Sequence, residues 1–208
     1  MIEIKRVEKT DKDVINAIVD IHMKTFEGFF LTFLGRGFLR QMYTSYCLHE
    51  PSELYVAEED GKPLGFVAYS ADMSGLYKFM IKKKLIPFAW YALGGFLRRP
   101  SAFMRLVRAF LKPGESRREE NYIELSSIGV SPEVKSRGVG SMLISHVKDS
   151  VDFDTYEYIS LETDAENNEL ANHFYKKNGF VLVREYETRE GRKMNEYRYG
   201  VKNEDTVS

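Results

Sequence analysis

Hydrophobic and polar residues follow regular spacings along the chain, and the N-terminal third shows both the strand and the helix period. Alternation of apolar and polar residues is typical of a strand, whereas apolar residues three and four apart are typical of an amphipathic helix. Two β-rich runs also flank the turn residues Asp60 and Gly61, which indicates an antiparallel hairpin. These patterns predict a strand over 2–8, helices over 13–25 and 36–48, and strands over 53–58 and 64–71.

The C-terminal half alternates between the two periods and ends in a second hairpin. The predicted elements are a strand over 121–130, a helix over 138–150, a strand over 156–163, a helix over 167–178, and final strands over 180–188 and 194–201. Some of these strands are joined by hairpins and others are separated by helices. We therefore predict an α/β (α+β) fold with a mixed, mostly antiparallel central sheet and helices on both faces.

The segment between the third and fourth predicted strands differs in charge from the rest of the chain. Residues 73–112 hold nine Lys or Arg and no Asp or Glu, whereas the other 168 residues have a net charge of −10. A chain of 208 residues has the length of one domain. We therefore predict a single domain over 1–208 that carries a basic helical insertion at about 73–120.

Composition excludes several kinds of protein and site. The chain has one cysteine, Cys47, so it forms no intramolecular disulfide, and we expect an intracellular, cytoplasmic protein. The longest uncharged apolar run, 85–97, has 13 residues, whereas a membrane-spanning helix needs about 20. The four histidines lack a metal-ligand spacing, so no metal site is expected. A pI of about 6.5 and the lack of a recognised motif argue against nucleic acid as a partner.

The most informative stretch is the run VSPEVKSRGVGS at 130–141, between a predicted strand and a predicted helix. Gly138 and Gly140 remove side chains where the helix begins, and the N–H groups of a first helical turn have no internal partner. Lys135 and Arg137 add two positive charges. This composition predicts a pyrophosphate cradle. The Walker A and dinucleotide-binding patterns are absent, and an ordinary helix start with two glycines is the alternative.

Two motifs together give the chain a family resemblance. The first is Val-x-Pro followed by a basic residue and Gly-x-Gly, at Val130, Pro132, Lys135, Gly138 and Gly140. The second is carried by Asn168, Ala171, Tyr175, Gly179 and Phe180. With both motifs in this order, the chain resembles the GNAT superfamily of acetyl-CoA-dependent N-acetyltransferases. Lys135 stands where the family has Gln or Arg. Lysine keeps the positive charge of Arg but not its fork geometry.

The resemblance implies that acetyl-CoA is the acetyl donor and that no metal is used. The pantetheine arm would lie along 128–130, and the pyrophosphate would contact the amides of 135–140. The strand of the first motif and the next strand would part to admit the cofactor, with Gly129 marking a bulge and Asn168 capping its helix or touching the cofactor. The expected cofactor-binding residues are Ile128, Gly129, Val130, Lys135, Ser136, Arg137, Gly138, Val139, Gly140, Ser141 and Asn168.

The resemblance also implies two side chains that transfer protons. Tyr175 occupies the position of the family's general acid, and a tyrosine packed in the core is the alternative. Glu124 lies where the histone acetyltransferase branch has its general base, and a carboxylate pointing to solvent is the alternative. Regular alternation would place positions 124, 126, 128 and 130 on one side of the strand.

The implied reaction is transfer of the acetyl group of acetyl-CoA to a primary amine. Phe29 and Phe30 fall in the region that forms one wall of the acceptor site in this family. We expect a small-molecule acceptor, and an amino sugar first, if the basic segment forms a lid over an anionic substrate. Two other interpretations of 73–112 stay open: peripheral contact with anionic membrane, and a solvated face that stabilises a dimer.

Two functions of other classes also stay open. Because a fold does not fix a function, the chain could be a non-catalytic CoA-binding or sensor module. It could also be a membrane-surface adaptor that uses the basic insertion. The sequence is compatible with a monomer or a homodimer.

Overall fold

The computed structural model describes residues 1–83, 120–134, 137–188 and 191–200 of the chain. The strands are β1 (Ile2–Arg6), β2 (Ser52–Glu59), β3 (Lys62–Ser70), β4 (Tyr122–Val130), β5 (Tyr158–Asp164), β6 (Val181–Glu187) and β7 (Lys193–Tyr199). The helices are α1 (Lys12–Thr25), α2 (Phe30–Phe33), α3 (Arg36–Tyr46), the 3₁₀ turn η1 (Pro132–Val134), α6 (Val139–Ser150) and α7 (Glu169–Lys177). Residues 73–83 are also helical.

The predicted elements agree with these bounds to within about two residues at each end. The sequence pattern does not predict the short α2 and η1. The helices expected in the rest of the basic insertion fall at 84–119, outside the described residues.

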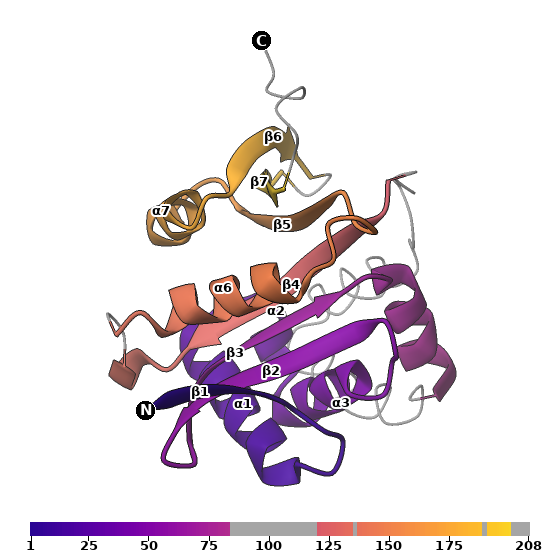
Figure 1. The fold of residues 1–208 in the computed structure, drawn as a ribbon, viewed down its shortest axis with the longest axis vertical. Coiled ribbons are helices and arrows are strands. Elements are labelled where there is room, and N and C mark those ends of the chain that lie inside the picture. Colours follow the sequence, from indigo (N-terminus) through magenta and orange to yellow (C-terminus); the bar gives the residue numbers. More distant parts are fainter. Residues whose placement is uncertain (84–119, 135–136, 189–190, 201–208) are drawn as a thin grey trace.

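The strands form one seven-stranded sheet in the order β1-β2-β3-β4-β5-β7-β6 (Figure 1). Every neighbouring pair is antiparallel except β4 and β5, which are parallel. The chain crosses between these two strands through α6, because parallel neighbours need a crossover connection. The predicted mixed, mostly antiparallel sheet is therefore confirmed.

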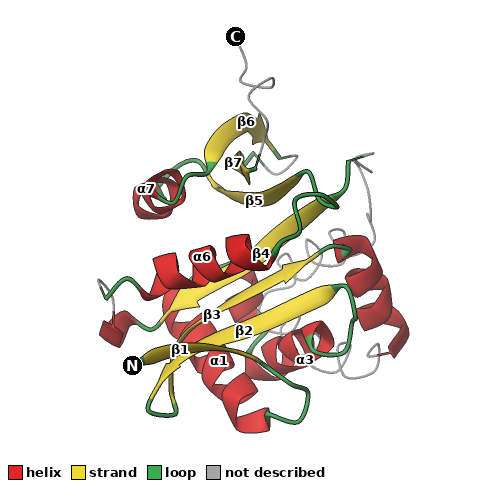
Figure 2. Ribbon diagram, viewed as in Figure 1, coloured by secondary structure: helices red, strands yellow, loops and turns green. Residues whose placement is uncertain are grey.

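Two apolar clusters on opposite faces of the sheet hold the helices. On β3, Phe66 and Ala68 belong to the cluster with α1 and α3, whereas Val67 and Tyr69 belong to the cluster with α6. β3 is consequently buried on both faces. Figure 2 shows α6 on one side of the sheet and α1 and α3 on the other, which confirms the predicted helices on both faces.

β4 and β5 pair over three positions and then part. Tyr122, Ile123 and Glu124 lie opposite Tyr158, Ile159 and Ser160. Beyond these pairs β4 continues to Val130 and β5 to Asp164, and Figure 1 shows the two strands running apart. The expected parting is confirmed, and it lets side chains from both faces of the sheet meet at its centre.

An extra residue in β4 interrupts the alternation of side chains halfway along the strand. Leu125 lies opposite Tyr69 and Ser127 lies opposite Ala68, so Ser126 has no partner residue in β3. β4 therefore has one residue more than β3 over this stretch, which is a β-bulge.

The bulge corrects two expectations drawn from the sequence. Ser126 hydrogen-bonds to a side chain of α3, whereas Ile128 packs in the cluster of α6, so positions 124, 126, 128 and 130 do not share one face. Gly129, expected to mark the bulge, pairs regularly with β3. One inserted residue shifts a period of two by one position, so every side chain after it changes face.

Candidate functional site

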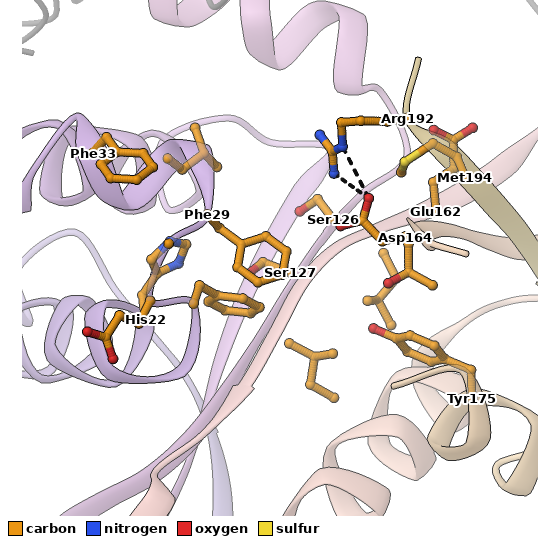
Figure 3. Close-up of a pocket in the computed structure, with 17 residues that line it drawn as sticks. His22, Phe29, Phe33, Ser126, Ser127, Glu162, Asp164, Tyr175, Arg192 and Met194 are labelled. Carbon is orange, nitrogen blue, oxygen red and sulfur yellow. Dashed lines mark hydrogen bonds and ion pairs between the residues drawn. The ribbon is translucent and has the colours of Figure 1, made fainter. Parts of the chain in front are cut away.

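A cavity of about 880 Å³ lies where β4 and β5 part. Figure 3 shows its walls. They come from the end of α1 and the segment after it, the bulged half of β4, the end of β5, the start of β7, and α7. These elements are distant in sequence, and the parting of the strands brings them to one space. Concave sites of this volume are typical of small-molecule and cofactor binding.

One wall of the cavity is aromatic. Phe26, Phe29 and Phe33 line it, and the rings of Phe26 and Phe29 meet edge to face with centroids 5.8 Å apart. Phe29 keeps 44% of its surface exposed, so its ring is open to an occupant of the cavity. Of the two residues expected in the acceptor wall, Phe29 therefore lines the cavity, and the side chain of Phe30 lies outside what the structure describes.

The opposite wall carries charges from β5 and the start of β7 (Figure 3). Arg192 donates two hydrogen bonds to one oxygen of Asp164, at 2.7 and 3.1 Å. Tyr186 donates a hydrogen bond to Glu162 at 2.7 Å. The cavity thus combines an apolar wall with groups that orient a polar ligand.

Tyr175 reaches the cavity from α7. Its ring packs against those of Phe174 and Phe180, and Figure 3 shows its hydroxyl pointing into the cavity. Within the described residues this hydroxyl has no hydrogen-bond partner. Burial raises the pKa of Tyr175 to about 12, so the phenol keeps its proton at neutral pH. A protonated hydroxyl at this place is able to donate a proton, and the role of Tyr175 as the acid stays a prediction.

Glu124 lies at the edge of the region rather than in the cavity wall. It is opposite Ser160, in the last position where β4 and β5 pair, and it is not among the described residues that line the cavity. It is half-buried. Burial raises the pKa of Tyr46 in α3, and the charges of Tyr77 and, more weakly, Glu124 raise it further, so Glu124 lies near Tyr46. Its role as a base stays a prediction.

The two serines of the β4 bulge line the cavity and are held by tyrosines of α3. The hydroxyls of Ser126 and Tyr46 lie 2.6 Å apart, and Ser126 also donates to the carbonyl of Ala68 at 3.0 Å. Ser127 Oγ lies 3.4 Å from the hydroxyl of Tyr43. The pattern of residues does not point to either serine, because a bulge depends on how two strands pair.

His22 lines the cavity from the last turn of α1 and is also absent from the sequence-based candidates. It is 3% exposed, and its Nδ1 lies 2.7 Å from the hydroxyl of Tyr43. Its Nε2 is buried without a partner in the described part of the chain. The sequence does contain a sign of this residue. His22 continues the apolar stripe of Ile15 and Ile18 on α1, and a polar residue in such a stripe is unusual.

The predicted cradle begins with a left-handed residue before α6. Gly138 has φ +77° at the N-cap, and Val139, Gly140 and Ser141 form the first helical turn. A Cβ on Gly140 would lie 3.1 Å from Cε2 of Phe174, so the glycine allows α6 and α7 to approach closely. The first-turn N–H groups have no acceptor within the helix and can bind an anion.

The basic residues of the cradle are described only in part. Arg137 donates to both carboxylate oxygens of Glu59, at 2.9 Å each. Lys135 and Ser136 lie outside the described residues.

Asn168 does not cap its helix with its side chain. It occupies the N-cap position of α7, but its Nδ2 donates to Thr163 Oγ1 at 2.6 Å in β5. The side chain therefore ties α7 to the strand that borders the cavity, which corrects the expected cap. Contact between Asn168 and the cofactor stays a prediction.

Gly129 shows why the strand needs a glycine at the expected pantetheine site. A Cβ here would lie 2.7 Å from Cε1 of Phe66 and 3.4 Å from Cε2 of Phe26. The two residues beside Gly129 have other surroundings. Ile128 lines the cavity, and the carbonyl of Val130 accepts a hydrogen bond from Thr25 at 3.1 Å.

We expect Gly129→Ala to destabilise the fold by about 1–3 kcal/mol, the usual cost of overpacking a close-packed site. Urea unfolding measures this change. In a protein that already carries Phe66→Leu, Gly129→Ala should lower the free energy of unfolding by less, because the ring atom that the new Cβ would meet is gone. Equal midpoints for Gly129→Ala and the parent chain would contradict the described packing.

The described ranges hold neither a metal-binding cluster nor a membrane-spanning helix. No group of three or more His, Cys, Asp or Glu is arranged there to hold a metal ion. No helix in these ranges is long and apolar enough to cross a membrane.

Comparison with known proteins identifies the family. The model of the acetyltransferase (GNAT) family matches residues 15–180. A GNAT-family acetyltransferase from Bacillus cereus is 17% identical, with a TM-score of 0.59, and the match covers 98% of this chain and 99% of that one. The ribosomal-protein-S18-alanine N-acetyltransferase of Escherichia coli is 15% identical, with a TM-score of 0.58, over 100% and 99% of the two chains.

A third solved structure, Chaetomium thermophilum Naa20 in complex with a bisubstrate analogue, is 17% identical, with a TM-score of 0.58, over 99% of this chain and 92% of that one. At these identities the structures show the fold alone. No curated protein sequence matches the chain significantly. The match of the family model over most of the chain decides the assignment: this chain belongs to the GNAT acetyltransferase family.

Proposed function

We propose that residues 1–208 form one transferase domain that moves the acetyl group of acetyl-CoA to the nitrogen of a primary amine. One observation carries the proposal: the hydroxyl of Tyr175 points into the cavity that opens where β4 and β5 part. An acid at this place would be able to protonate the leaving sulfur of a thioester bound between the strands.

The residues present fit the donor. Gly138, at the N-cap of α6, has open space where a Cβ would stand, and the first turn of α6 offers N–H groups to a pyrophosphate. Acetyl-CoA would supply an activated acetyl group to these residues. Ile128 and the β4 backbone would bind its pantetheine arm, Gly138–Ser141 would bind its phosphates, and Tyr175 would protonate its thiolate.

The class of acceptor is the finer part of the proposal. The amino-sugar expectation rests on the basic segment, most of which lies outside the described residues. The name of one similar enzyme, the ribosomal-protein-S18-alanine N-acetyltransferase of Escherichia coli, indicates an alanine of a protein as its acceptor. An acceptor panel should therefore contain both small amines and peptides with a free N-terminus.

Acetyl-CoA should raise the unfolding temperature of the protein. A ligand that binds only the folded state adds about 2.7 kcal/mol at 100 times its Kd. For a chain of this size each kcal/mol is about 2–4 °C. Differential scanning fluorimetry with and without acetyl-CoA measures the shift, and an unchanged temperature at millimolar acetyl-CoA would sink the proposal. A shift without transfer to any amine would favour the CoA-binding or sensor module instead.

A further inference from the structure

We propose that Ser127, Tyr43 and His22 form a relay that removes the proton from the attacking amine. The inference rests on the proposed function, because it names how the same cavity would handle the second proton of amide formation. Tyr175 can deliver a proton to the thiolate, but the amine nitrogen must lose one as its bond to the acetyl carbon forms. Glu124 of β4 does not line the described cavity. Three other carboxylates do: Asp164 is paired with Arg192, Glu162 accepts a hydrogen bond from Tyr186, and Glu27 is exposed.

The three side chains are connected in space although they come from three elements. Ser127 lies on the β4 bulge and lines the cavity, with its Oγ 3.4 Å from the hydroxyl of Tyr43 in α3. That hydroxyl lies 2.7 Å from Nδ1 of His22 in α1. The bulge creates the connection, because it turns Ser127 to the face of the sheet where α1 and α3 pack.

His22 is a polar ring in an apolar site, and only one of its two nitrogens has a hydrogen-bond partner in the described part of the chain. It is 3% exposed and packs against the rings of Phe26, with centroids 4.7 Å apart, and Phe66. Its Nε2 is buried without a partner in the described part of the chain. A buried polar atom left unpaired costs stability, and a phenylalanine would fill an apolar site without that cost. The bond between Nδ1 and Tyr43 is therefore the hydrogen bond that the imidazole makes within the described residues.

The protonation states fix the direction of the hydrogen bond between Tyr43 and His22, and the burial that keeps the imidazole neutral also makes it a weaker base. Burial lowers the pKa of His22 to about 4, so the ring is neutral and keeps a lone pair at physiological pH. Burial raises the pKa of Tyr43, so its hydroxyl stays protonated and can donate to Nδ1. Of the residues that contact the His22 ring, Tyr43 is the titratable one, and the others are Phe26 and Phe66.

The step balances without any further reagent. The amine nitrogen forms a bond to the acetyl carbon and gives its proton to Ser127 Oγ, as Ser127 passes its own proton to Tyr43 and Tyr43 passes its proton to His22 Nδ1. The bond between carbon and sulfur breaks, and Tyr175 protonates the sulfur. His22 and Tyr175 lie on opposite sides of the cavity (Figure 3), so the two transfers do not compete. The proton on His22 then returns through Tyr43 and Ser127 to solvent in the cavity, and solvent reprotonates Tyr175.

The test is steady-state kinetics of His22→Asn, Tyr43→Phe and Ser127→Ala. The assay uses acetyl-CoA with phenylethylamine, glucosamine and a peptide with N-terminal alanine. Asn can keep a hydrogen bond to Tyr43 but cannot take a proton. We expect each variant to lower kcat by about 10- to 100-fold and to change both KM values by less than about twofold. The double variant His22→Asn/Tyr43→Phe should be no slower than the slower single variant, because both break one relay.

Matched controls separate the relay from general damage. His146→Asn removes another imidazole whose Nε2 is buried without a partner in the described residues, but in α6 and away from the cavity. Tyr69→Phe removes a hydroxyl from another buried tyrosine, on the opposite face of the sheet. Both controls should keep kcat within about twofold. Thermal unfolding checks that every variant folds. If the His22 and Tyr43 variants unfold, Ser127→Ala still tests the relay, because it removes only one hydroxyl oxygen from the cavity wall.

The outcomes distinguish the relay from the proposed function. Normal kcat in folded His22→Asn or in Ser127→Ala, with active parent protein, overturns the relay and leaves acetyl transfer standing. A rise in KM with unchanged kcat also overturns it, because that result assigns the residues to binding alone. If the parent protein acetylates none of the three amines, both proposals fail.

Discussion

Replacing Tyr175 by Phe should lower kcat by about 100-fold or more and leave the Kd of acetyl-CoA within about twofold of the parent value. The substitution removes only the hydroxyl, which points into the cavity and has no hydrogen-bond partner within the described residues. The ring keeps its packing against Phe174 and Phe180, so the fold should be unaffected. Initial rates of CoA release and calorimetric titration measure the two quantities.

The pH dependence gives a second readout of the same residue. Because burial raises the pKa of Tyr175 to about 12, the acid stays protonated as the pH rises, and kcat should not fall through its deprotonation below about pH 10. Tyr197→Phe is a matched control, since Tyr197 contacts Tyr175 but donates its hydroxyl to Asn172. Equal turnover in Tyr175→Phe and the parent protein would exclude Tyr175 as the acid.

Replacing Gly140 by Glu should weaken acetyl-CoA binding by about 30-fold or more. The new carboxylate would stand in the first turn of α6, where the phosphates are proposed to bind, and two like charges about 5 Å apart repel by roughly 1–3 kcal/mol in a partly solvated site. A negative charge at a helix N-terminus stabilises the helix itself, so the loss of binding should not come from unfolding of α6.

Gly140→Ala is the control for the crowding of Phe174. Its Cβ would meet the same ring, at 3.1 Å, but it adds no charge. We expect a much smaller loss of affinity for Ala than for Glu, measured by calorimetric titration of acetyl-CoA. Equal losses would show that close packing of α6 and α7, rather than an anion site, makes this position sensitive.

The sequence predicts the elements well because each element follows a local period. The stripe of α1 and the alternation of β2 and β3 need no distant information. The exception is β4, whose bulge depends on how Ser126 and Ser127 pair with β3 and with tyrosines of α3. Regular counting therefore assigns the second half of this strand to the wrong faces.

The candidate site is predictable only where a motif carries it. Tyr175 and the glycines before and within α6 are recognised by their spacing. His22 and the Asp164–Arg192 pair line one cavity only because β4 and β5 part. Their positions in the sequence do not indicate that they are close in space. The apolar stripe of α1 could have drawn attention to His22, but not to its partner Tyr43.

The most direct test of the central claim is acetyl transfer itself. The purified protein would be incubated with isotope-labelled acetyl-CoA and the three-amine panel, and the products would be analysed by mass spectrometry beside the free CoA released. We predict a labelled N-acetyl product from at least one amine, in equal amount to the CoA, and its loss in Tyr175→Phe. CoA release without labelled amide, or no turnover with any amine while acetyl-CoA is bound, would contradict the assignment as an N-acetyltransferase.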